Sequence, residues 1–519
     1  MRNTKFIFIN YKLILTFVPV KRHIVNQDPN FDMETIARIS DFLWTYIIIT
    51  MLVGCAIYFT FRLRGVQFRR MGEMVRLLFS STQDDGMADD RAQHQVPGTG
   101  QASPATPAHR RSINSFQAFA VSLSSRVGTG NLAGVASAIC VGGPGAIFWM
   151  WLMALLGAST AFFEATLAQL YKRRGEDSFY GGPAYYMQYG LHQRWMGVVF
   201  AIFIIYTFGI ANQITQSNTL CDAVSTAVNE ASGQEVLPSI SVAVGLMLLT
   251  FGIIFGGIQR ISRFAAMVVP FMAIGYLLLA LIILIMNIGQ VPAMLRLIVQ
   301  SAFGLKQAAG GMLGMAIMQG VTRGLFSNEA GEGSAPNAAA TATISHPVKQ
   351  GLLQALGVFT DTLVICTCTA FIILLSGLYN SGQDGIILTG SAMQYHFGIF
   401  GRWFLTAAIF LFAYSTIIAN YFYGETNIRF ITRQDWAVQA FRIVTGFTIL
   451  MGGFMTLQET WCLVDLGMAL MTFINLVALM LLSRHVVRLF HDYFQQRRAG
   501  KDPVFDRNLI PEIRDDIEW

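Results

Sequence analysis

Long apolar segments separated by short polar or basic ones run through most of the chain, and this pattern predicts an all-α polytopic membrane protein with about eleven transmembrane helices. Most segments have roughly the 20 residues that an α-helix needs to cross the hydrocarbon core of a bilayer. The predicted spans are 41–61, 115–141, 146–170, 195–224, 240–255, 264–286, one that begins near 312, 352–378, 403–428, 438–454 and 462–482. Basic residues after the first, third and last spans put those ends in the cytoplasm, with the N-terminus outside the cell's inner (plasma) membrane.

Polar and charged stretches divide the chain into six regions. Residues 1–40 form an N-terminal extension whose apolar part is short and contains Lys12, which makes it a poor span and an atypical signal peptide. Met33 is an alternative start of the protein. The regions that follow are a first helix with an amphipathic interfacial helix (41–82), a polar linker (83–112), two groups of five helices (113–290 and 291–492) and a cytoplasmic tail (493–519).

Glycines and polar residues interrupt the second predicted span between Arg126 and Gly134, where the chain reads RVGTGNLAG. An unpaired backbone group in a bilayer costs several kcal/mol unless it lines a cavity or binds something, so we expect a broken helix and a binding site. The GxGxxA pattern of a dinucleotide site is also present, but no acidic residue follows about 20 positions later. Helix packing through Gly130 and Gly134 explains the glycines and leaves Arg126, Thr129 and Asn131 unexplained.

A second interruption follows an apolar run and extends from Gln319 to Pro336. Glycine frees the backbone and proline removes a donor, so we expect a second broken helix there. The two interruptions fall in the first helix of each group of five. The second lies five crossings after the first, so the two broken helices cross the membrane in opposite directions. Paired broken helices in inverted repeats indicate a secondary transporter with a substrate site near the bilayer midplane.

Composition narrows the class of protein further. Only 13% of the 519 residues are charged and 54% are hydrophobic, against about 25% charged residues in soluble domains. The net charge is +6, and the basic residues lie beside the apolar spans. The preference of basic residues for the cytoplasmic ends of membrane helices explains this position better than nucleic-acid binding does. The cysteines form no CxxC pair and the histidines no HExxH motif, so we expect no metal centre or cofactor. A nucleophile paired with a base is not evident, so the protein is not predicted to be an enzyme.

Several polar side chains within the predicted spans require partners. Ser415 and Thr416 are either ordinary helix hydroxyls that bond to their own backbone or oxygen ligands of a cation beside carbonyls freed near Ser124 and Val127. Acidic residues inside spans are functional by default, and each is either a buried partner of one of the arginines of the two breaks or lies near a cytoplasmic end of its span. The sequence does not decide how they pair. The acidic residues concerned are Glu164, Asp361 and Glu425, and the arginines are Arg126 and Arg323.

Four motifs resemble those of the sodium:alanine symporter family, also called the alanine or glycine:cation symporters. They are RVGTGNLAGVA (126–136), GGPGAIFWMW (142–151), GGP (181–183) and RGLFSNEAG (323–331) with its continuation to Pro336. The resemblance covers about residues 41–490 and implies a leucine-transporter-type fold. It also implies sodium-coupled import of a small neutral amino acid by alternating access, with proton coupling or a channel-like permease as the alternatives.

The resemblance also implies two adjoining sites. The substrate site consists of Gly128, Thr129, Gly130, Asn131, Gln216, Phe326, Ser327, Asn328 and Asn420. The sodium site consists of Ser124, Val127, Ser415 and Thr416. Many relatives carry tryptophan at the position of Asn420, so the pocket is expected to be more polar here and to admit glutamine besides alanine or glycine. The expected partners are therefore an amino acid, sodium as the coupling ion and the bilayer, without nucleic acid.

Overall fold

The computed structural model describes residues 33–79, 113–175, 178–304 and 310–519, and nearly all of these residues are helical. Most of the N-terminal extension and the polar linker lie outside the described residues. Within the described part, the only sheet pairs two short strands, β1 (Arg173–Arg174) and β2 (Phe179–Tyr180), in antiparallel register. The fold is therefore all-α, as predicted.

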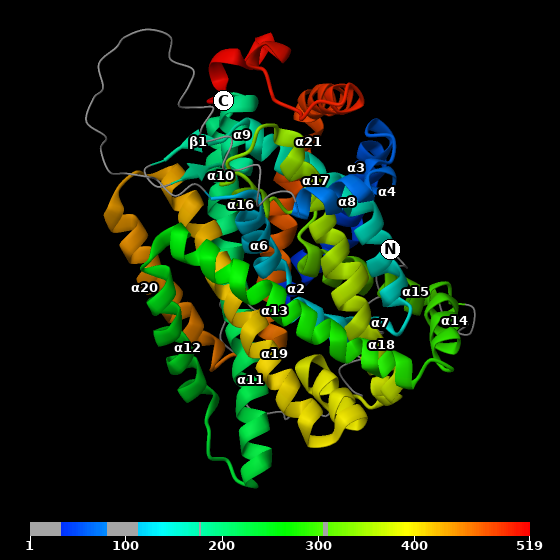
Figure 1. Cartoon of the computed structure of the whole chain (residues 1–519). Helices are drawn as coiled ribbons and strands as arrows, with labels where there is room; N and C mark the ends of the chain where they lie inside the picture. Colours follow the sequence, from blue (N-terminus) through cyan, green and yellow to red (C-terminus); the bar gives the residue numbers. More distant parts are fainter. Residues whose placement is uncertain (1–32, 80–112, 176–177, 305–309) are drawn as a thin grey trace, which may run out of the picture.

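The helices follow one another with short connections (Figure 1). The first half of the chain contains α2 (Met33–Phe42), η1 (Leu43–Ile48), α3 (Ile49–Arg62), α4 (Val66–Arg69), α6 (Ser115–Arg126), η2 (Gly130–Gly134), α7 (Val135–Gly142), α8 (Ala146–Leu170), α9 (Pro183–Gly190), α10 (Arg194–Tyr206), η3 (Thr207–Ala211), α11 (Asn212–Ser232), α12 (Ser239–Ile254) and α13 (Gly257–Met286). The second half contains α14 (Val291–Ala302), α15 (Gly310–Asn328), α16 (Pro336–Ala339), α17 (Pro347–Val358), η4 (Phe359–Cys366), α18 (Thr367–Ser376), η5 (Leu378–Asn380), α19 (Gly385–Ile431), α20 (Asp435–Gly452), α21 (Leu457–Arg498), η6 (Arg507–Leu509) and η7 (Pro511–Asp516).

Every predicted span overlaps one of these helices, but the helices differ in length and hydropathy. Seven in the described part are long and apolar enough to cross a membrane: Thr35–Arg62, Ala146–Leu170, Arg194–Ser232, Gly257–Met286, Pro347–Ser376, Gly385–Ile431 and Leu457–Arg498. Gly130–Gly142, Ser239–Ile254 and Val291–Ala302 are shorter apolar helices. The protein is therefore a multi-pass helical membrane protein.

The helices differ from the predicted pattern in two places. The sequence did not predict α14, and α19 begins well before the predicted ninth span. A kink at Gly398, where φ is +60° and ψ is −144°, divides α19 into two helices of different direction. Only glycine adopts such a backbone conformation readily, because it has no Cβ.

Four segments of the described chain, η1 to η4, are π-helical turns inside longer helices. A π-turn inserts an extra residue into an α-helix and often lies at a functional site. One of the four, η2, contains the predicted site residues Gly130 and Asn131, while η3 directly precedes the helix of the predicted site residue Gln216 and η4 contains the acidic Asp361. These local irregularities therefore mark the region where chemistry is expected.

The broken helices lie at the centre of the helix packing. The α8 helix packs against both α15 and α17, while α19 packs against α6, α11 and α13. A capping box starts α6, because Gln117 N donates to Asn114 Oδ1 (2.7 Å) and Asn114 N donates to Gln117 Oε1 (3.1 Å). This cap fixes the start of the helix that leads into the first break.

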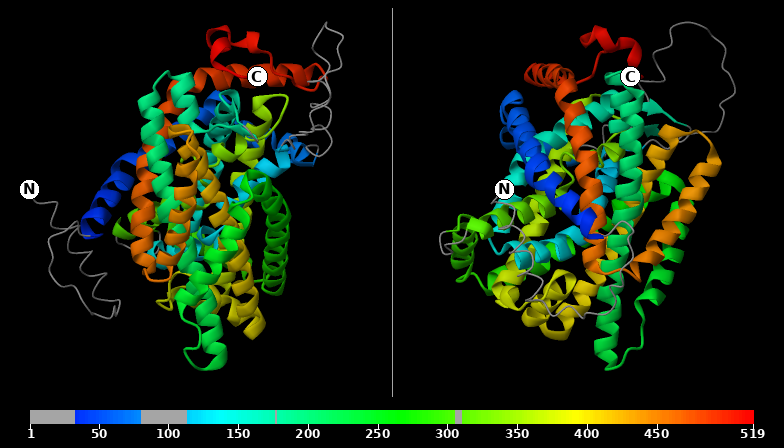
Figure 2. Two further views of the ribbon diagram at one scale, coloured as in Figure 1. Left: turned by 90° about the vertical axis from the view of Figure 1, so that its left-hand side faces the viewer. Right: turned by 180° about the vertical axis from the view of Figure 1, so that it is seen from behind.

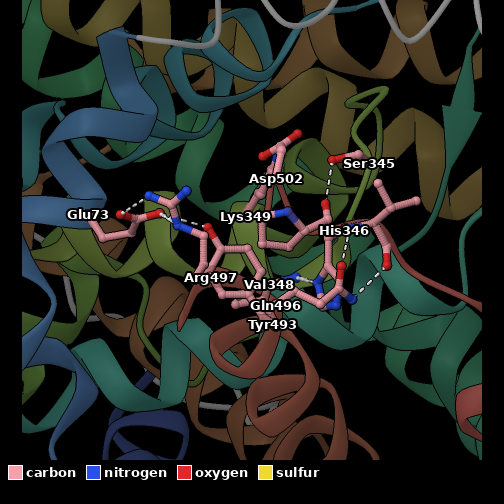
Figure 3. A network of polar contacts seen from close by, with 11 residues as sticks. Glu73, Ser345, His346, Val348, Lys349, Tyr493, Gln496, Arg497 and Asp502 are labelled. Atoms are coloured by element: carbon pink, nitrogen blue, oxygen red, sulfur yellow. Dashed lines mark hydrogen bonds and ion pairs between the residues drawn. The ribbon is translucent and has the colours of Figure 1, made fainter. Parts of the chain in front are cut away.

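Residues after α21 lie across one end of the helical bundle, opposite the connection between α11 and α12 (Figure 2). Three isoleucines of this tail are buried: Ile510, Ile513 and Ile517. Lys349 Nζ lies 3.0 Å from Asp502 Oδ1 (Figure 3). The Ser345 carbonyl accepts the Phe505 N–H at 2.9 Å. The tail, predicted from its charge to be soluble, is thus packed against the ends of the helices.

Candidate functional site

The first interrupted helix consists of α6, a non-helical turn and the η2–α7 helix. Val127 leaves the helical conformation (φ −83°, ψ 84°), and the helix resumes at Gly130. Side chains satisfy two amides of the turn: Gly128 N–H donates to Asn131 Oδ1 (2.9 Å) and Thr129 N–H donates to Gln216 Oε1 (3.0 Å). The helix is broken where the sequence predicted, and the break turns backbone groups toward side chains of the protein interior.

The hydroxyl of Thr416, from α19, lies against the carbonyls of this break. Its Oγ1 is 2.8 Å from the Ser124 carbonyl oxygen, 2.9 Å from that of Phe412 and 3.4 Å from that of Val127. A Cβ atom on Gly128 would lie only 2.5 Å from the same Oγ1, so α19 approaches this closely only because residue 128 is glycine. Three of the four residues predicted for the sodium site therefore meet.

The fourth residue, Ser415, reaches the same group of oxygens less directly. Its hydroxyl donates to the Phe412 carbonyl (3.0 Å) and lies 3.8 Å from the sulfur of Met272 on α13. The Phe412 carbonyl thus accepts from two neighbouring hydroxyls, and the sequence analysis did not identify it. The sequence indicates the Phe412 carbonyl only indirectly, since Ser and Thr in helices bond to carbonyls three or four residues earlier.

Phe326 and Ser327 come from the last turn of α15 and lie against the first break, as predicted for an opposing wall. A Cβ atom on Gly130 would lie 2.8 Å from the Phe326 ring and 3.3 Å from the Ser327 Cα. The Phe326 ring also packs edge-on against Trp461 of α21, with ring centroids 4.6 Å apart. The two breaks are therefore in direct contact through a glycine and an aromatic ring.

The carboxyl group of Asp361, in the π-turn η4, joins the two breaks. Its Oδ1 accepts from Asn131 Nδ2 (2.6 Å), and its Oδ2 accepts from the hydroxyls of Ser327 (2.7 Å) and Thr362 (2.9 Å). The sequence analysis left an ion pair of Asp361 with Arg126 or Arg323 open, and the structure shows neutral donors at this carboxyl group. The residue instead holds one side chain from each broken helix, and Asn131 therefore points to a protein carboxyl group.

The second interruption extends from the end of α15 to the start of α16 and contains its own charged residues. Glu329 (φ 57°), Gly331 (φ 105°) and Gly333 (φ 86°) have positive φ angles, which are costly for a residue such as Glu329. The Glu329 carboxyl group accepts from Ser125 Oγ and Ser334 Oγ, both at 2.5 Å. The side chain of Asn328 turns toward this loop, since its Oδ1 accepts the Ala330 N–H (3.0 Å).

Asn420, also on α19, lies between the two interruptions. Its Oδ1 is 2.8 Å from Ser125 Oγ, the same hydroxyl that donates to Glu329. Its Nδ2 is buried and has no hydrogen-bond partner among the described residues. Since a buried donor without an acceptor costs about 1–3 kcal/mol, this amide is available for a ligand.

The remaining buried charges, whose pairing the sequence left open, have partners that the sequence analysis did not name. Arg323 forms a bidentate pair with Asp465 (3.0 and 2.6 Å) and lies 4.1 Å from the centre of the Trp461 ring. Glu425 pairs with Arg429, four residues later on α19, at 2.8 Å. The sequence could not identify Asp465 as the partner of Arg323, because a contact across helices leaves no spacing in the chain. The i,i+4 spacing of Glu425 and Arg429, in contrast, was a signal that the sequence analysis missed.

Arg126 and Glu164, one of the pairings that the sequence left open, do not bond to each other. Arg126 Nη1 donates to the Gln354 carbonyl at 3.2 Å, and within the described ranges this arginine forms no ion pair. Glu164 accepts from the Gly331 N–H (3.1 Å) and from Asn475 Nδ2 (2.6 Å). Glu164 therefore stabilises the second break through neutral donors.

All thirteen predicted site residues are buried, so this conformation closes the site to solvent. Closing a site in this way excludes water and makes entry of a ligand depend on movement of the surrounding helices. In the described part of the chain, no group of three or more His, Cys, Asp or Glu side chains has the arrangement of a metal site. The oxygen atoms around Thr416 are carbonyl and hydroxyl oxygens, which suit a hard monovalent cation.

Comparison with known proteins agrees with this geometry. Residues 30–507 match the model of the sodium:alanine symporter family. The chain is 48% identical over 474 residues to the probable sodium/glutamine symporter GlnT of Bacillus subtilis (strain 168), covering 91% of this chain and 92% of that protein. It is 44% identical to the amino-acid carrier protein AlsT of the same organism (92% and 96% covered). It is also 36% identical to the sodium/proton-dependent alanine carrier protein of Bacillus sp. (strain PS3), with 76% and 91% covered.

The match to the family model extends over both interruptions and over the α19 residues that lie against them. The chain belongs to the sodium:alanine symporter family.

Proposed function

We propose that this protein imports a small neutral amino acid together with sodium by alternating access. The observation that carries the proposal is the convergence of the Thr416 hydroxyl with the carbonyls of Ser124 and Phe412 at a broken helix. Unwound backbone carbonyls in transporter helices are the groups that coordinate sodium. The names of two relatives, a sodium/glutamine symporter and a sodium/proton-dependent alanine carrier, support cation-coupled transport of an amino acid.

Sodium bound between α19 and the first break would tie two helices that are otherwise joined by a few hydrogen bonds. The ligands would be the carbonyls of Ser124, Val127 and Phe412 and the hydroxyls of Ser415 and Thr416. An ion shifts a conformational equilibrium only by its difference in affinity for the two states. We infer that sodium favours the conformation in which these oxygens lie together, and that this conformation binds the amino acid.

The amides of Gly128, Thr129 and Gly130 would bind the carboxylate of the substrate. In the closed conformation described here, Asn131 and Gln216 accept two of these N–H groups. Backbone amides at the start of a helix favour an anionic ligand because of their orientation and the helix dipole. The proposal therefore requires the amide oxygens of Asn131 and Gln216 to move aside when the substrate enters.

We further propose a topology of eleven crossings with inverted repeats over 113–290 and 291–492, in the plasma membrane. The N-terminus would lie outside and the C-terminus in the cytoplasm. Contacts of the tail support this orientation, because the ends that it touches are all assigned to the cytoplasm by the basic residues. Trp519 Nε1 donates to the Gln169 carbonyl at the end of α8, and Asp502 pairs with Lys349 at the start of α17.

The deciding experiment is uptake of labelled amino acids into proteoliposomes. We expect accumulation when an inward sodium gradient is imposed and none when choline replaces sodium. Accumulation that persists unchanged in choline with only a pH gradient would reject sodium coupling. Flux that does not saturate with substrate, or that is not coupled to the ion, would indicate a channel-like permease instead.

The substrate class can be tested at Asn420, whose buried Nδ2 suits an acceptor such as the side-chain carbonyl of glutamine. We expect Asn420→Trp to fill the space and to narrow the range of substrates toward alanine and glycine. The measurement is competition by unlabelled glutamine for uptake of labelled alanine. Asn420→Ala is the comparison variant, since it removes the Nδ2 donor without filling the space. Unchanged glutamine competition in Asn420→Trp would contradict the assignment.

A proton as coupling ion is the second candidate, and Glu332 is the residue that favours it. Its carboxyl group is buried, and neither oxygen has a hydrogen-bond partner among the described residues. A carboxyl group without donors is much cheaper to bury with its proton than without it. If a proton is coupled through this group, Glu332→Gln will abolish uptake driven by a pH gradient and leave sodium-driven uptake. Uptake that loses neither component in Glu332→Gln would exclude this role.

A further inference from the structure

A basic pocket lies far from the proposed transport site, between the turn after α3 and the last turns of α21. Its volume is about 310 Å³, which falls at the lower end of the range for sites that bind small ligands. The lining residues are Leu63, Arg64, Val66, Arg69, Arg70, Phe490, His491, Phe494, Gln495 and Arg498. The four apolar side chains are buried, whereas Arg64, Arg69 and Arg498 are exposed. The pocket thus has an apolar floor and a guanidinium rim.

The wall that follows α3 is held in place by local structure. Arg64 (φ 54°) and Gly65 (φ 65°) turn the chain sharply between α3 and α4. The next residues are anchored by the buried Gln67, whose Nε2 donates to Thr60 Oγ1 (2.8 Å) and to the Leu155 carbonyl of α8 (3.4 Å). This wall is therefore formed without any ligand.

Polar contacts hold that wall against α21. Glu73 accepts from the Tyr493 hydroxyl (3.0 Å) and forms an ion pair with Arg497 (3.0 Å), as Figure 3 shows. The Arg70 guanidinium also lies 4.5 Å from the centre of the Phe494 ring. Such a cation–π contact is attractive and fixes the direction of this side chain. The two walls, more than 400 residues apart in the chain, are therefore firmly connected.

The charge of the pocket is not compensated by its own residues. Among the described residues that line it there are four arginines and no carboxylate. The nearby Glu73 is already engaged by Arg497 and Tyr493. The positive-inside rule explains why arginines are frequent at this membrane surface, but it does not explain why four converge on one concave site. Four like charges around a cavity attract an anion.

We propose that this pocket binds the phosphate-containing headgroup of an anionic phospholipid in the cytoplasmic leaflet. The guanidinium groups would donate hydrogen bonds to the phosphate oxygens, a geometry for which arginine is well suited. Basic pockets between helices on the cytoplasmic side are known to accept such headgroups. The assignment to this leaflet rests on the topology proposed above, but the binding itself does not depend on symport.

A phospholipid fits the site better than a free phosphate because of the apolar surroundings. The floor consists of Leu63, Val66, Phe490 and Phe494, which a small inorganic anion would not use. Exposed apolar side chains flank the turn as well: Phe61 is 77% exposed and Phe68 is 52% exposed. Side chains of this kind lie at a membrane interface, where acyl chains can cover them.

The test compares two charge-matched double variants of the full chain. Both are purified in detergent and titrated with phosphatidylglycerol. The lipid that each retains is counted by native mass spectrometry. The pocket variant is Arg69→Gln with Arg498→Gln. The control is Arg76→Gln with Arg484→Gln, two exposed arginines outside the pocket. We expect the pocket variant to bind about 30-fold more weakly, from roughly a fivefold loss per arginine, and the control to bind like the unaltered chain. Equal weakening in both variants would show unspecific attraction and overturn the proposal.

Three further arms separate other occupants from the lipid. Phosphatidylcholine in place of phosphatidylglycerol should not be retained, and equal retention would reject a site for anionic lipid. Inorganic phosphate at high concentration should displace little of the bound lipid, and complete displacement would indicate a free-phosphate site. The third arm replaces Asp84, Asp85, Asp89 and Asp90 by asparagine. Lipid that binds only in this variant would identify the polar linker (83–112) as the occupant of the pocket. Because no arm involves sodium or an amino acid, each result is independent of the transport assay.

Discussion

The two helix interruptions differ in what they contain and in what satisfies them. The first is a turn of three residues between α6 and η2, and it carries no charge of its own. Its partners come from other helices, since Gln216 belongs to α11 and Thr416 to α19. The second is longer, contains Glu329 and Glu332 and is partly satisfied by its own residues, such as Ser334.

This difference suggests a division of roles. A short neutral break bordered by side chains from other helices presents amides and carbonyls to a ligand, so changes there should alter affinity. A longer break with buried carboxyl groups and a non-glycine residue at positive φ stores strain that a change of conformation can release. Changes in the second break should therefore alter the rate of transport more than the affinity for sodium.

The largest effect is expected at Asp361, because it belongs to both breaks. Asp361→Asn keeps the size of the side chain but replaces one of the two acceptor oxygens by an NH₂ donor, so Asn131 and Ser327 can no longer both donate to separate oxygens as they do to the carboxyl group. Hydrogen bonds to a carboxylate contribute roughly 1.5–3 kcal/mol each, so uptake should fall by about 100-fold or more. The measurement is the initial rate of uptake in proteoliposomes, normalised to the amount of folded protein.

Thr362→Ala provides the control for this prediction. It removes a third donor to the Asp361 carboxyl group but leaves both links between the breaks. Uptake should then fall only severalfold. If Thr362→Ala were as damaging as Asp361→Asn, the bridge between the breaks would not be the reason for the loss.

The positions of both breaks could be predicted from the sequence, whereas the contacts between them could not. Glycines and polar residues inside an apolar segment, such as Gly128 and Thr129, cannot form an ordinary membrane helix, so the chain itself indicates a break. The placement of Ser415 and Thr416 beside Ser124 rested on family resemblance. Nothing in the spacing of the chain connects Asp361 to Ser327, because that contact depends on how η4 packs against α15.

Parts of the fold that lie outside the spans were also poorly predictable. The tail has the charge of a soluble segment, yet its isoleucines are buried and its terminal Trp519 is bonded to Gln169. A few apolar residues at irregular spacing give no periodic signal, so their burial depends on the surface that the ends of the helices offer. The π-turns are equally invisible, since a single inserted residue does not change the apolar pattern.

The next effect concerns sodium and belongs to the first break alone. Thr416→Ala removes the hydroxyl that lies 2.8 Å from the Ser124 carbonyl, so the sodium concentration for half-maximal uptake should rise about tenfold. The preference among amino acids should stay unchanged. Thr416→Ser keeps the hydroxyl and should resemble the unaltered protein. An unaltered sodium dependence in Thr416→Ala would remove the main support for the proposed ion site.

The smallest effects separate contacts between the breaks from contacts within the second one. Ser125 and Ser334 both donate to the Glu329 carboxyl group at 2.5 Å, but Ser125 belongs to α6 and Ser334 to the same loop as Glu329. When the breaks move apart, the Ser125 contact is lost while the Ser334 contact travels with the loop. Ser125→Ala should therefore change the maximal uptake rate by about three- to tenfold, and Ser334→Ala by about twofold, from the roughly 1 kcal/mol of one hydrogen bond. The sodium requirement should not change in either variant. A larger effect in Ser334→Ala than in Ser125→Ala would mean that the second break acts through its own shape and not through its contact with the first.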